Sequence, residues 1–316
     1  MKKKVSSYQS KNLNEKKTCG IVIPVFNEAS VIGKTVKRIQ GVIARSRGWS
    51  FEIICVDDGS SDESPKILKS LRGISLLQHA SNRGYGAALQ TGLNHSFNEW
   101  VFIVDADATY PLEDLPRFLK EASSGADMVI GARRGIGINL SPLRRFARWI
   151  LRKMSHLLTG VMVPDLNSGM RIFRKQLFLQ FKNLLPYGFS FTTTLTLASL
   201  YNNYQIKFIP ISYERRVGAS NIRPVRDFFG FLMLIVRIAT YFEPLRFFLP
   251  LSFIVVLLGF LKGARDFIAL GHIGALAVIV TILGVQFFVL GVLAEVIVHR
   301  SSNFYPPTPG RRKLMS

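Results

Sequence analysis

The strongest structural signal in this sequence is the apolar run Trp100-Val-Phe-Ile-Val104, followed directly by Asp105-Ala-Asp107. An unbroken run of β-branched and aromatic side chains is typical of a strand that is buried on both faces. Side chains two residues apart on an extended segment point to the same side, so both carboxylates can face one point. The stretch therefore predicts a buried strand with an acidic pair at its carboxyl end.

The same pattern of a short apolar run and an amphipathic stretch repeats on both sides of this segment. The expected strands are 20–24, 51–56, 75–78, 100–104 and 127–130, and the expected helices are 29–45, 64–72, 85–97 and 112–123. Strands that alternate with helices indicate an α/β fold with a mainly parallel, doubly wound sheet. In such sheets ligands bind beyond the carboxyl ends of the strands. Polar clusters follow several of the expected strands: Asn27-Glu28, Asp57-Asp58, Asn82-Arg83 and Asp105/Asp107.

Charge and hydropathy divide the chain. The formal net charge of +21 favours a polyanionic partner, which could be nucleic acid, an anionic membrane face or a phosphorylated substrate. Residues 1–18 are polar and lysine-rich without an apolar core, so we expect a disordered basic arm rather than a signal peptide. Cys19 and Cys55 lack metal-type spacing, which indicates two free, buried thiols.

The C-terminal third is much more apolar than the rest. Residues 19–223 form the expected catalytic domain, 224–244 an interfacial amphipathic helix, 245–299 two transmembrane helices, and 300–316 a tail. The apolar stretches are 247–261 and 267–298; two buried core helices are the alternative. Positive charge in the tail and in the catalytic region predicts that both lie on the cytoplasmic side of the cell membrane.

Three familiar phosphate or metal signatures fail. Gly33-Lys34-Thr35 resembles the end of a P-loop, but Glu28 stands where that motif needs a glycine. The Gly84-Tyr-Gly86 segment lacks the third glycine of a dinucleotide fingerprint, and the chain has no zinc spacing of Cys and His. Two carboxylates beside a diphosphate are a normal way to hold Mg²⁺ or Mn²⁺. By itself the 105–107 pair could equally be a solvated turn, and Asp57-Asp58-Gly59-Ser60 a capped one.

Seven motifs in order resemble family 2 glycosyltransferases of the GT-A fold, and specifically the dolichol- or polyprenyl-phosphate sugar transferases with two C-terminal membrane spans. They are Ile23-Pro24-Val-Phe26-Asn27-Glu28, Val56-Asp57-Asp58-Gly59-Ser60-Ser61-Asp62, Asn82-Arg83-Gly84-Tyr-Gly86-Ala87-Ala88, Val104-Asp105-Ala-Asp107, Gly131-Ala-Arg133, Asp165-Leu-Asn-Ser168-Gly169-Met-Arg171-Ile-Phe173 and Arg216-Val-Gly218-Ala-Ser220. This resemblance covers about residues 19–227 and the hairpin that follows.

The resemblance implies a donor site and a metal site. The donor residues would be Pro24, Phe26, Glu28 and Asp57 around the nucleotide base and ribose, with Asp58 beside them and Ser220 further along the chain. Asp105 and Asp107 would hold Mg²⁺ or Mn²⁺ and the donor diphosphate, with Asp107 counted as catalytic. Thr109 stands where many relatives carry Gln, so the third metal contact is unassigned.

Three arginines, Arg133, Arg148 and Arg216, are the candidates for the acceptor phosphate and count as catalytic. A polyprenyl monophosphate carries about −1.5 to −2 charges at pH 7, so it needs cations more than a general base. Guanidinium suits that task through bidentate contacts. Asp165 and Arg171 could contact substrate, but a structural ion pair between them is the favoured interpretation.

The leading hypothesis is an inverting transfer of one sugar from a UDP- or GDP-sugar to a polyprenyl phosphate. A processive polysaccharide synthase is an alternative, but such relatives carry Q-x-x-R-W, and here Arg145 precedes Arg148-Trp149. A non-catalytic membrane scaffold is the other. No nucleic-acid motif is present, so we expect no nucleic-acid partner. The sugar, the donor nucleotide and assembly into a homo-oligomer stay open.

Overall fold

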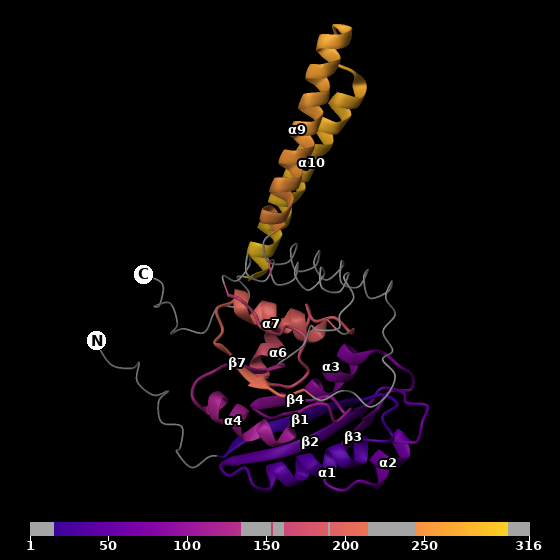
Figure 1. Ribbon diagram of the computed structural model, residues 1–316, viewed down its shortest axis with the longest axis vertical. Helices are drawn as coiled ribbons and strands as arrows, with labels where there is room; N and C mark the ends of the chain where they lie inside the picture. The colour runs from indigo at the N-terminus through magenta and orange to yellow at the C-terminus, as the bar shows by residue number, and fades with distance from the viewer. Residues whose placement is uncertain (1–15, 134–152, 154–160, 189, 214–243, 303–316) are drawn as a thin grey trace, which may run out of the picture. The chain divides into compact units, whose positions relative to one another are not determined.

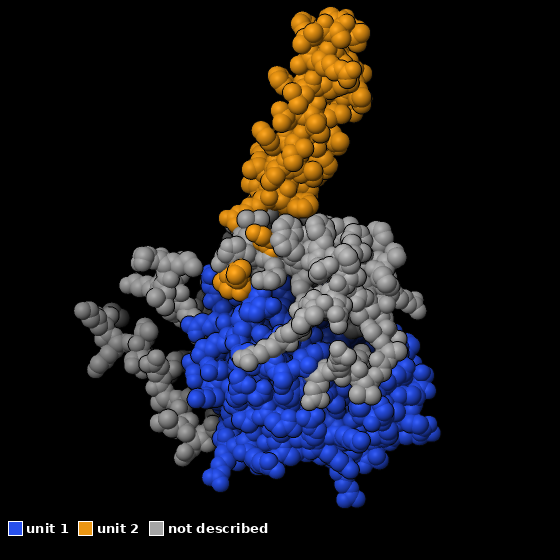
Figure 2. Space-filling model, viewed as in Figure 1, with its two compact units in different colours: residues 1–139, 163–220 blue, residues 140–162, 221–316 orange. Residues whose placement is uncertain are grey.

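A computed structural model describes residues 16–133, 153, 161–188, 190–213 and 244–302. The chain divides into two compact units (Figure 2). One comprises Met1–Asn139 and Val163–Ser220, and the other comprises Leu140–Met162 and Asn221–Ser316. The predicted interfacial helix at 224–244 falls almost entirely outside the described residues.

The first unit is built on a seven-stranded sheet with the order β3-β2-β1-β4-β6-β5-β7 (Figure 1). The strands are β1 Lys17–Val25, β2 Trp49–Asp57, β3 Ser75–Gln78, β4 Trp100–Ile103, β5 Met128–Arg133, β6 Arg171–Arg174 and β7 Ile206–Ile211. Strand β6 runs antiparallel to β4 and β5, and the other pairs are parallel. The predicted mainly parallel α/β sheet is therefore confirmed.

Helices cover both faces of this sheet, which explains its unbroken apolar strands. The helices are α1 Ile32–Ile43, α2 Ser64–Ser70, α3 Tyr85–His95, α4 Leu115–Ser123, α6 Lys175–Phe181 and α7 Phe191–Tyr201. Alternate residues of β1, such as Ile21 and Ile23, share a core with α1, α2 and α4. Val22, on the opposite face, lies against α3 at Gly92.

Several element boundaries differ from the sequence prediction by a few residues, and some elements were missed. The helix expected at 112–123 begins as a short 3₁₀ turn, Leu112–Asp114, and becomes α-helical at Leu115, one residue before Pro116. Strand β7 and helices α6 and α7 were not predicted. Strand β6 was not predicted either. It has only four residues with an arginine at each end, so neither an apolar run nor a clear alternation marks it.

The second unit contains a hairpin of two long helices, α9 Pro244–Leu270 and α10 Ala275–Ser302. Segments Pro244–Leu270 and Ala275–Val298 are long and apolar enough to cross a membrane, and only 17% of an apolar 18-residue stretch within each is buried. This low burial argues against the alternative of two soluble core helices. The apolar stretch expected at 267–298 is divided: its first four residues end α9, and Gly271 turns the chain at a φ of +73°.

Small residues bring the two hairpin helices close together. A Cβ atom at Gly284 would lie 2.6 Å from Val256, and one at Gly291 would lie 2.7 Å from Phe248. Ser252 Oγ donates a hydrogen bond of 2.8 Å to the carbonyl oxygen of Gly284. Close backbone approach of this kind is the usual basis of helix association in lipid.

We expect Gly92→Ala to destabilise the catalytic unit. A Cβ atom there would lie 2.6 Å from Val22 and 3.0 Å from Val56, two stiff side chains of the central strands. Overpacking of about 1–3 kcal/mol should outweigh the gain of about 1 kcal/mol that alanine brings to a helix. Thermal unfolding of the purified chain should show a lower Tm.

Gly41→Ala in α1 is the matched control, because a Cβ atom at Gly41 meets nothing within 4 Å. This substitution should leave the Tm unchanged or raise it. An equal response of the two variants would show that α3 does not pack as tightly on β1 and β2 as the structure indicates.

Candidate active site

The carboxyl ends of β1 and β2 form one rim of the site. Residues 26–29, after β1, are bound to the turn after β2 by backbone-to-side-chain hydrogen bonds. Asn27 N donates to Ser60 Oγ at 3.0 Å, and Asn27 Oδ1 accepts from Ser61 N at 2.8 Å. Asn27 adopts a φ of 55°, which asparagine tolerates better than most residues. The segment with Pro24, Phe26 and Glu28, all partly exposed, is thereby fixed beside Asp57.

Asp57 and Asp58 are adjacent but have different partners. Asp57 Oδ1 accepts a hydrogen bond of 3.1 Å from Ser60 N, and its Oδ2 accepts one of 3.1 Å from Gln78 Nε2. Asp58 lies 2.7 Å from His79 Nδ1 and accepts from the backbone N–H groups of Arg83 and Gly84 at 2.9 and 2.8 Å. Asp58 therefore fixes the 82–84 loop. Its expected place beside the nucleotide stays a prediction.

The acidic pair follows β4, as the sequence predicts. Ala106 between the two aspartates is buried, whereas Asp105 and Asp107 are both partly exposed. Tyr85 Oη donates a hydrogen bond of 2.9 Å to Asp105 Oδ1. A Cβ atom at Gly169 would lie 2.4 Å from the Asp105 carboxylate, so only glycine permits this approach. Burial and the charge of Asp107 raise the pKa of Asp105 to about 6.

Thr109, which stands where many members of the resembled family carry Gln, contacts Asp107. Its hydroxyl donates to Asp107 Oδ1 at 2.6 Å, and its backbone N–H lies 3.2 Å from the same oxygen. Ala108 adopts a φ of 58° to allow this turn. Thr109 therefore orients one carboxylate and is itself buried.

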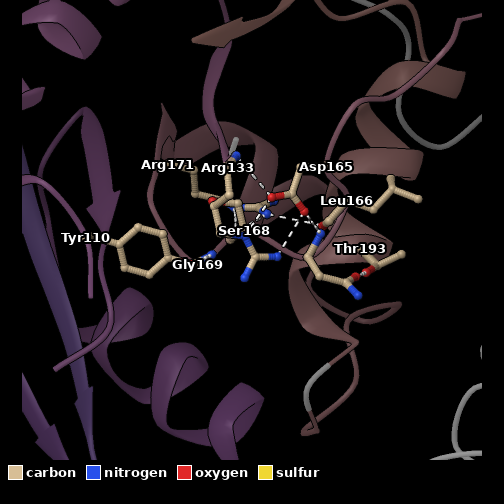
Figure 3. A network of polar contacts seen from close by, with 9 residues as sticks. Tyr110, Arg133, Asp165, Leu166, Ser168, Gly169, Arg171 and Thr193 are labelled. Atoms are coloured by element: carbon tan, nitrogen blue, oxygen red, sulfur yellow. Dashed lines mark hydrogen bonds and ion pairs between the residues drawn. The ribbon is translucent and has the colours of Figure 1, made fainter. Parts of the chain in front are cut away.

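Arg133, at the end of β5, faces this region and pairs with Asp165. Its Nε and Nη2 donate to the two Asp165 oxygens at 2.7 and 3.0 Å, which is a bidentate contact (Figure 3). Its guanidinium lies 5.1 Å from the ring centre of Tyr213. Burial opposes ionisation of Asp165, but the Arg133 hydrogen bonds lower its pKa below the usual value. Both groups are charged at neutral pH.

The ion pair expected between Asp165 and Arg171 is not what the structure shows, because Asp165 pairs with Arg133. Arg171 is fully buried and donates to the carbonyl oxygen of Ser168 (Figure 3). It also donates to the carbonyl oxygen of Thr192 and to Thr196 Oγ1. Burial lowers its pKa to about 10. Arg171 therefore joins the 166–168 segment to helix α7.

The structure brings most of the predicted site residues to one edge of the sheet and leaves three outside its description. Tyr110 connects the parts: its hydroxyl accepts from Gly169 N at 2.8 Å, and its ring lies 5.3 Å from that of Tyr213. Arg148, Arg216 and Ser220 lie outside the described residues, so their roles stay predictions. Sequence reasoning missed Tyr85 and Tyr110, although Tyr85 stands inside one of the quoted motifs.

Comparison with known proteins identifies two matching segments. Residues 20–181 match the family described as Glycosyl transferase family 2, and residues 243–299 match the GtrB C-terminal hairpin. A dolichyl-phosphate hexose transferase from Haloferax volcanii is 30% identical over 205 residues, which is 65% of this chain and 86% of the relative. An undecaprenyl-phosphate 4-deoxy-4-formamido-L-arabinose transferase from Klebsiella pneumoniae (strain 342) is 26% identical over 296 residues. This match covers 89% of this chain and 88% of the relative.

Solved structures support the fold. Glucosyl-3-phosphoglycerate synthase from Mycobacterium tuberculosis, with Mn²⁺, UDP and phosphoglyceric acid, aligns at a TM-score of 0.55 and 18% identity over 71% of this chain and 78% of its own. Mannosyl-3-phosphoglycerate synthase from Rubrobacter xylanophilus aligns at a TM-score of 0.55 and 17% identity, over 71% of this chain and 72% of its own. The predicted GT-A fold is confirmed, and the chain belongs to glycosyl transferase family 2, with a GtrB-type hairpin at residues 243–299.

Proposed function

We propose that the protein transfers one sugar from a nucleotide-diphosphate sugar to the phosphate of a polyprenyl lipid at the cytoplasmic face of a membrane. The observation that carries the proposal is the partly buried pair Asp105 and Asp107, within electrostatic reach of Arg133. The relatives that act on dolichyl and undecaprenyl phosphate, and the membrane hairpin, favour a lipid acceptor. Family membership favours a transferase over a non-catalytic scaffold.

The acidic pair fits a divalent cation. Burial and mutual repulsion make two negative charges costly here, and a cation would relieve that cost. Mn²⁺ in the mycobacterial neighbour is consistent with this assignment. Asp105 and Asp107 would hold Mg²⁺ or Mn²⁺, which when bound supplies positive charge to the donor diphosphate. Tyr85 and Thr109 keep one oxygen of each carboxylate in a fixed direction.

Arg133 is the described candidate for the acceptor phosphate. Two of its nitrogens bind Asp165, and among the described residues no hydrogen bond involves Nη1, so that nitrogen can donate to a phosphate oxygen. The lipid phosphate is already ionised, so its oxygen attacks the anomeric carbon directly. The new C–O bond forms as the bond to the nucleoside diphosphate breaks. A single displacement of this kind inverts the anomeric configuration.

The orientation at the membrane rests on charge. Residues 300–316 carry Arg300, Arg311, Arg312 and Lys313 and no acidic residue. Two spans place the segments before and after the hairpin on the same side, and the positive-inside rule makes that side cytoplasmic. A cytoplasmic catalytic unit would meet nucleotide sugars there. UDP and GDP donors both remain compatible with the rim around Asp57.

Asp107→Asn should abolish transfer while the protein stays folded. Loss of one carboxylate weakens the grip on a cation that must stabilise the leaving diphosphate, and such electrostatic contacts are worth roughly 10²–10³ in rate. The assay supplies radiolabelled nucleotide sugars and polyprenyl phosphate and measures lipid-extractable label. Asp114→Asn, which removes a carboxylate paired with Arg117 on α4, is the control. Full transfer by the Asp107 variant would sink the assignment.

Arg133→Lys should raise the KM for the lipid acceptor about 10–100-fold with a much smaller change in the donor KM. Lysine keeps the charge but loses the fork that binds Asp165 and a phosphate together. Arg174→Lys is the control, since Arg174 also stacks on an aromatic ring, Trp100, and pairs with Glu99. A rise confined to the donor KM would place Arg133 at the other substrate.

The raised pKa of Asp105 predicts how pH and metal affect stability. The folded state holds this proton more tightly than an ordinary carboxyl with a pKa of 3.8, so the stabilisation is complete below about pH 4. It is lost as pH rises through about 6, where the folded protein carries both negative charges. Without metal, the Asp105→Asn protein should therefore have a higher Tm than the wild-type protein at pH 7.5. Mn²⁺ should raise the wild-type Tm more at pH 7.5 than at pH 5; equal shifts would contradict the metal site.

A further inference from the structure

His79 lies directly after β3 and connects two elements that carry parts of the site. Its Nδ1 atom lies 2.7 Å from Asp58 Oδ1, and its Nε2 atom lies 2.9 Å from Thr91 Oγ1. The backbone N–H of His79 donates to the carbonyl oxygen of Asp57 at 2.9 Å, which continues the pairing of β3 with β2. The imidazole ring therefore bridges the acidic turn after β2 and the middle of helix α3.

The partners of the ring assign the direction of both hydrogen bonds. The Asp58 carboxylate already accepts from two backbone N–H groups, so the ring donates to it from Nδ1. A threonine hydroxyl can donate or accept, so the contact at Nε2 holds whether or not that nitrogen carries a proton. The side chains of His79 and Asp58 are only 5% and 4% exposed, so water competes little for these groups.

Asp58 and His79 together hold helix α3 at two points. Asp58 accepts from the N–H groups of Arg83 and Gly84, which directly precede the helix. His79 contacts Thr91, which comes seven residues after Gly84. Seven residues are almost two helical turns, so the two contacts lie on one side of the helix, about 10 Å apart along its axis. Hydrogen bonds are directional and apolar packing is not, so this pair of contacts fixes the rotation of α3.

The rotation of α3 decides where Tyr85 points. Tyr85 is the first residue of the helix, and its hydroxyl donates to Asp105 Oδ1 at 2.9 Å. This hydroxyl stands at the end of a long side chain, so a small rotation of the helix displaces it by more than a hydrogen bond tolerates. The contact between Tyr85 and Asp105 therefore depends on what holds the helix.

We propose that His79 is a positioning residue for the acidic pair. By bridging Asp58 and Thr91 it sets the rotation of α3, and through Tyr85 it sets the direction in which Asp105 faces a divalent cation. Both ring nitrogens are engaged, so His79 acts through other residues and is not a catalytic group. Supporting contacts behind metal ligands change metal affinity by about 10–100-fold. Because the cation belongs to the function proposed above, this role rests on that proposal.

Mn²⁺ binding to the full chain, followed by the electron paramagnetic resonance signal of the free ion, tests this role without turnover. Thr91→Val removes the hydroxyl at nearly constant shape and should weaken binding about tenfold. His79→Asn keeps a donor toward Asp58 but loses the contact to Thr91, so it should weaken binding equally. Thr91→Ser keeps the hydroxyl and should bind as the wild type does. His95→Asn, exposed at the end of the same helix, is the control. In the transfer assay the KM for the lipid acceptor should not change.

A metal-free measurement separates the positioning role from the metal site. Tyr85→Phe removes the hydroxyl that is bound to Asp105 and should lower the Tm. In the Thr91→Val protein that contact is already weakened, so Tyr85→Phe should lower the Tm by less than it does in the wild type. Such non-additivity is the signature of coupled residues.

Three results would overturn the positioning role. Wild-type Mn²⁺ affinity in the Thr91→Val protein would show that the bridge does not reach the acidic pair. An equal loss of affinity in the Thr91→Ser protein would assign the effect to packing rather than to the hydroxyl. Additive Tm changes would uncouple Thr91 from Tyr85. A wild-type protein that binds no Mn²⁺ would instead contradict the metal site, and the metal-free Tm comparison would still decide the role of His79.

Discussion

The geometry of the site depends on the hydrogen bonds that the carboxylate of Asp58 accepts. The residue is 3% exposed, and its carboxylate accepts hydrogen bonds from two consecutive backbone N–H groups, at Arg83 and Gly84, beside His79. The next residue, Tyr85, begins α3 and donates to Asp105. One buried carboxylate at the end of β2 therefore fixes the direction of another at the end of β4. Gly59 and Gly84 allow the tight approach with positive φ angles of 69° and 101°.

The site also balances charge over a short distance. Asp105 carries a raised pKa because burial and Asp107 disfavour its charge, and the cations of Arg133 and Arg171 only partly offset them. Asp165 accepts two hydrogen bonds from Arg133, and backbone carbonyl oxygens accept most of the hydrogen bonds that Arg171 donates. The cations that could neutralise the acidic pair are thus committed elsewhere. A site arranged in this way costs stability when empty and gains it when a cation binds.

Local signals made the sheet and the acidic pair predictable. Five of the parallel strands contain apolar runs that the sequence marks, and Asp105 and Asp107 directly follow one of them. The sixth, β7, carries Lys207 and a proline and was not predicted. The partner of Arg133 was not predictable, because Asp165 reaches it only through β6, which inserts antiparallel between β4 and β5. From the sequence alone, Arg133 and Arg171 are both possible partners of Asp165. Only the order of the strands in the folded sheet decides between them. The role of Thr109 was hidden for a related reason, since it depends on the left-handed turn at Ala108.

Both units face the same physical problem, a polar group away from water, and they solve it differently. The catalytic unit surrounds a buried charge with backbone groups, as at Asp58 and Arg171. In the hairpin, backbone groups are already used within each helix, so polar side chains turn to helix ends and nearby carbonyls, as Glu295 and Ser252 do. The glycines bring the two helices close enough for these contacts, since a Cβ atom at Gly284 would lie 2.7 Å from the backbone of Val256. The polar groups between the helices are thus satisfied by the same close approach that holds the hairpin together.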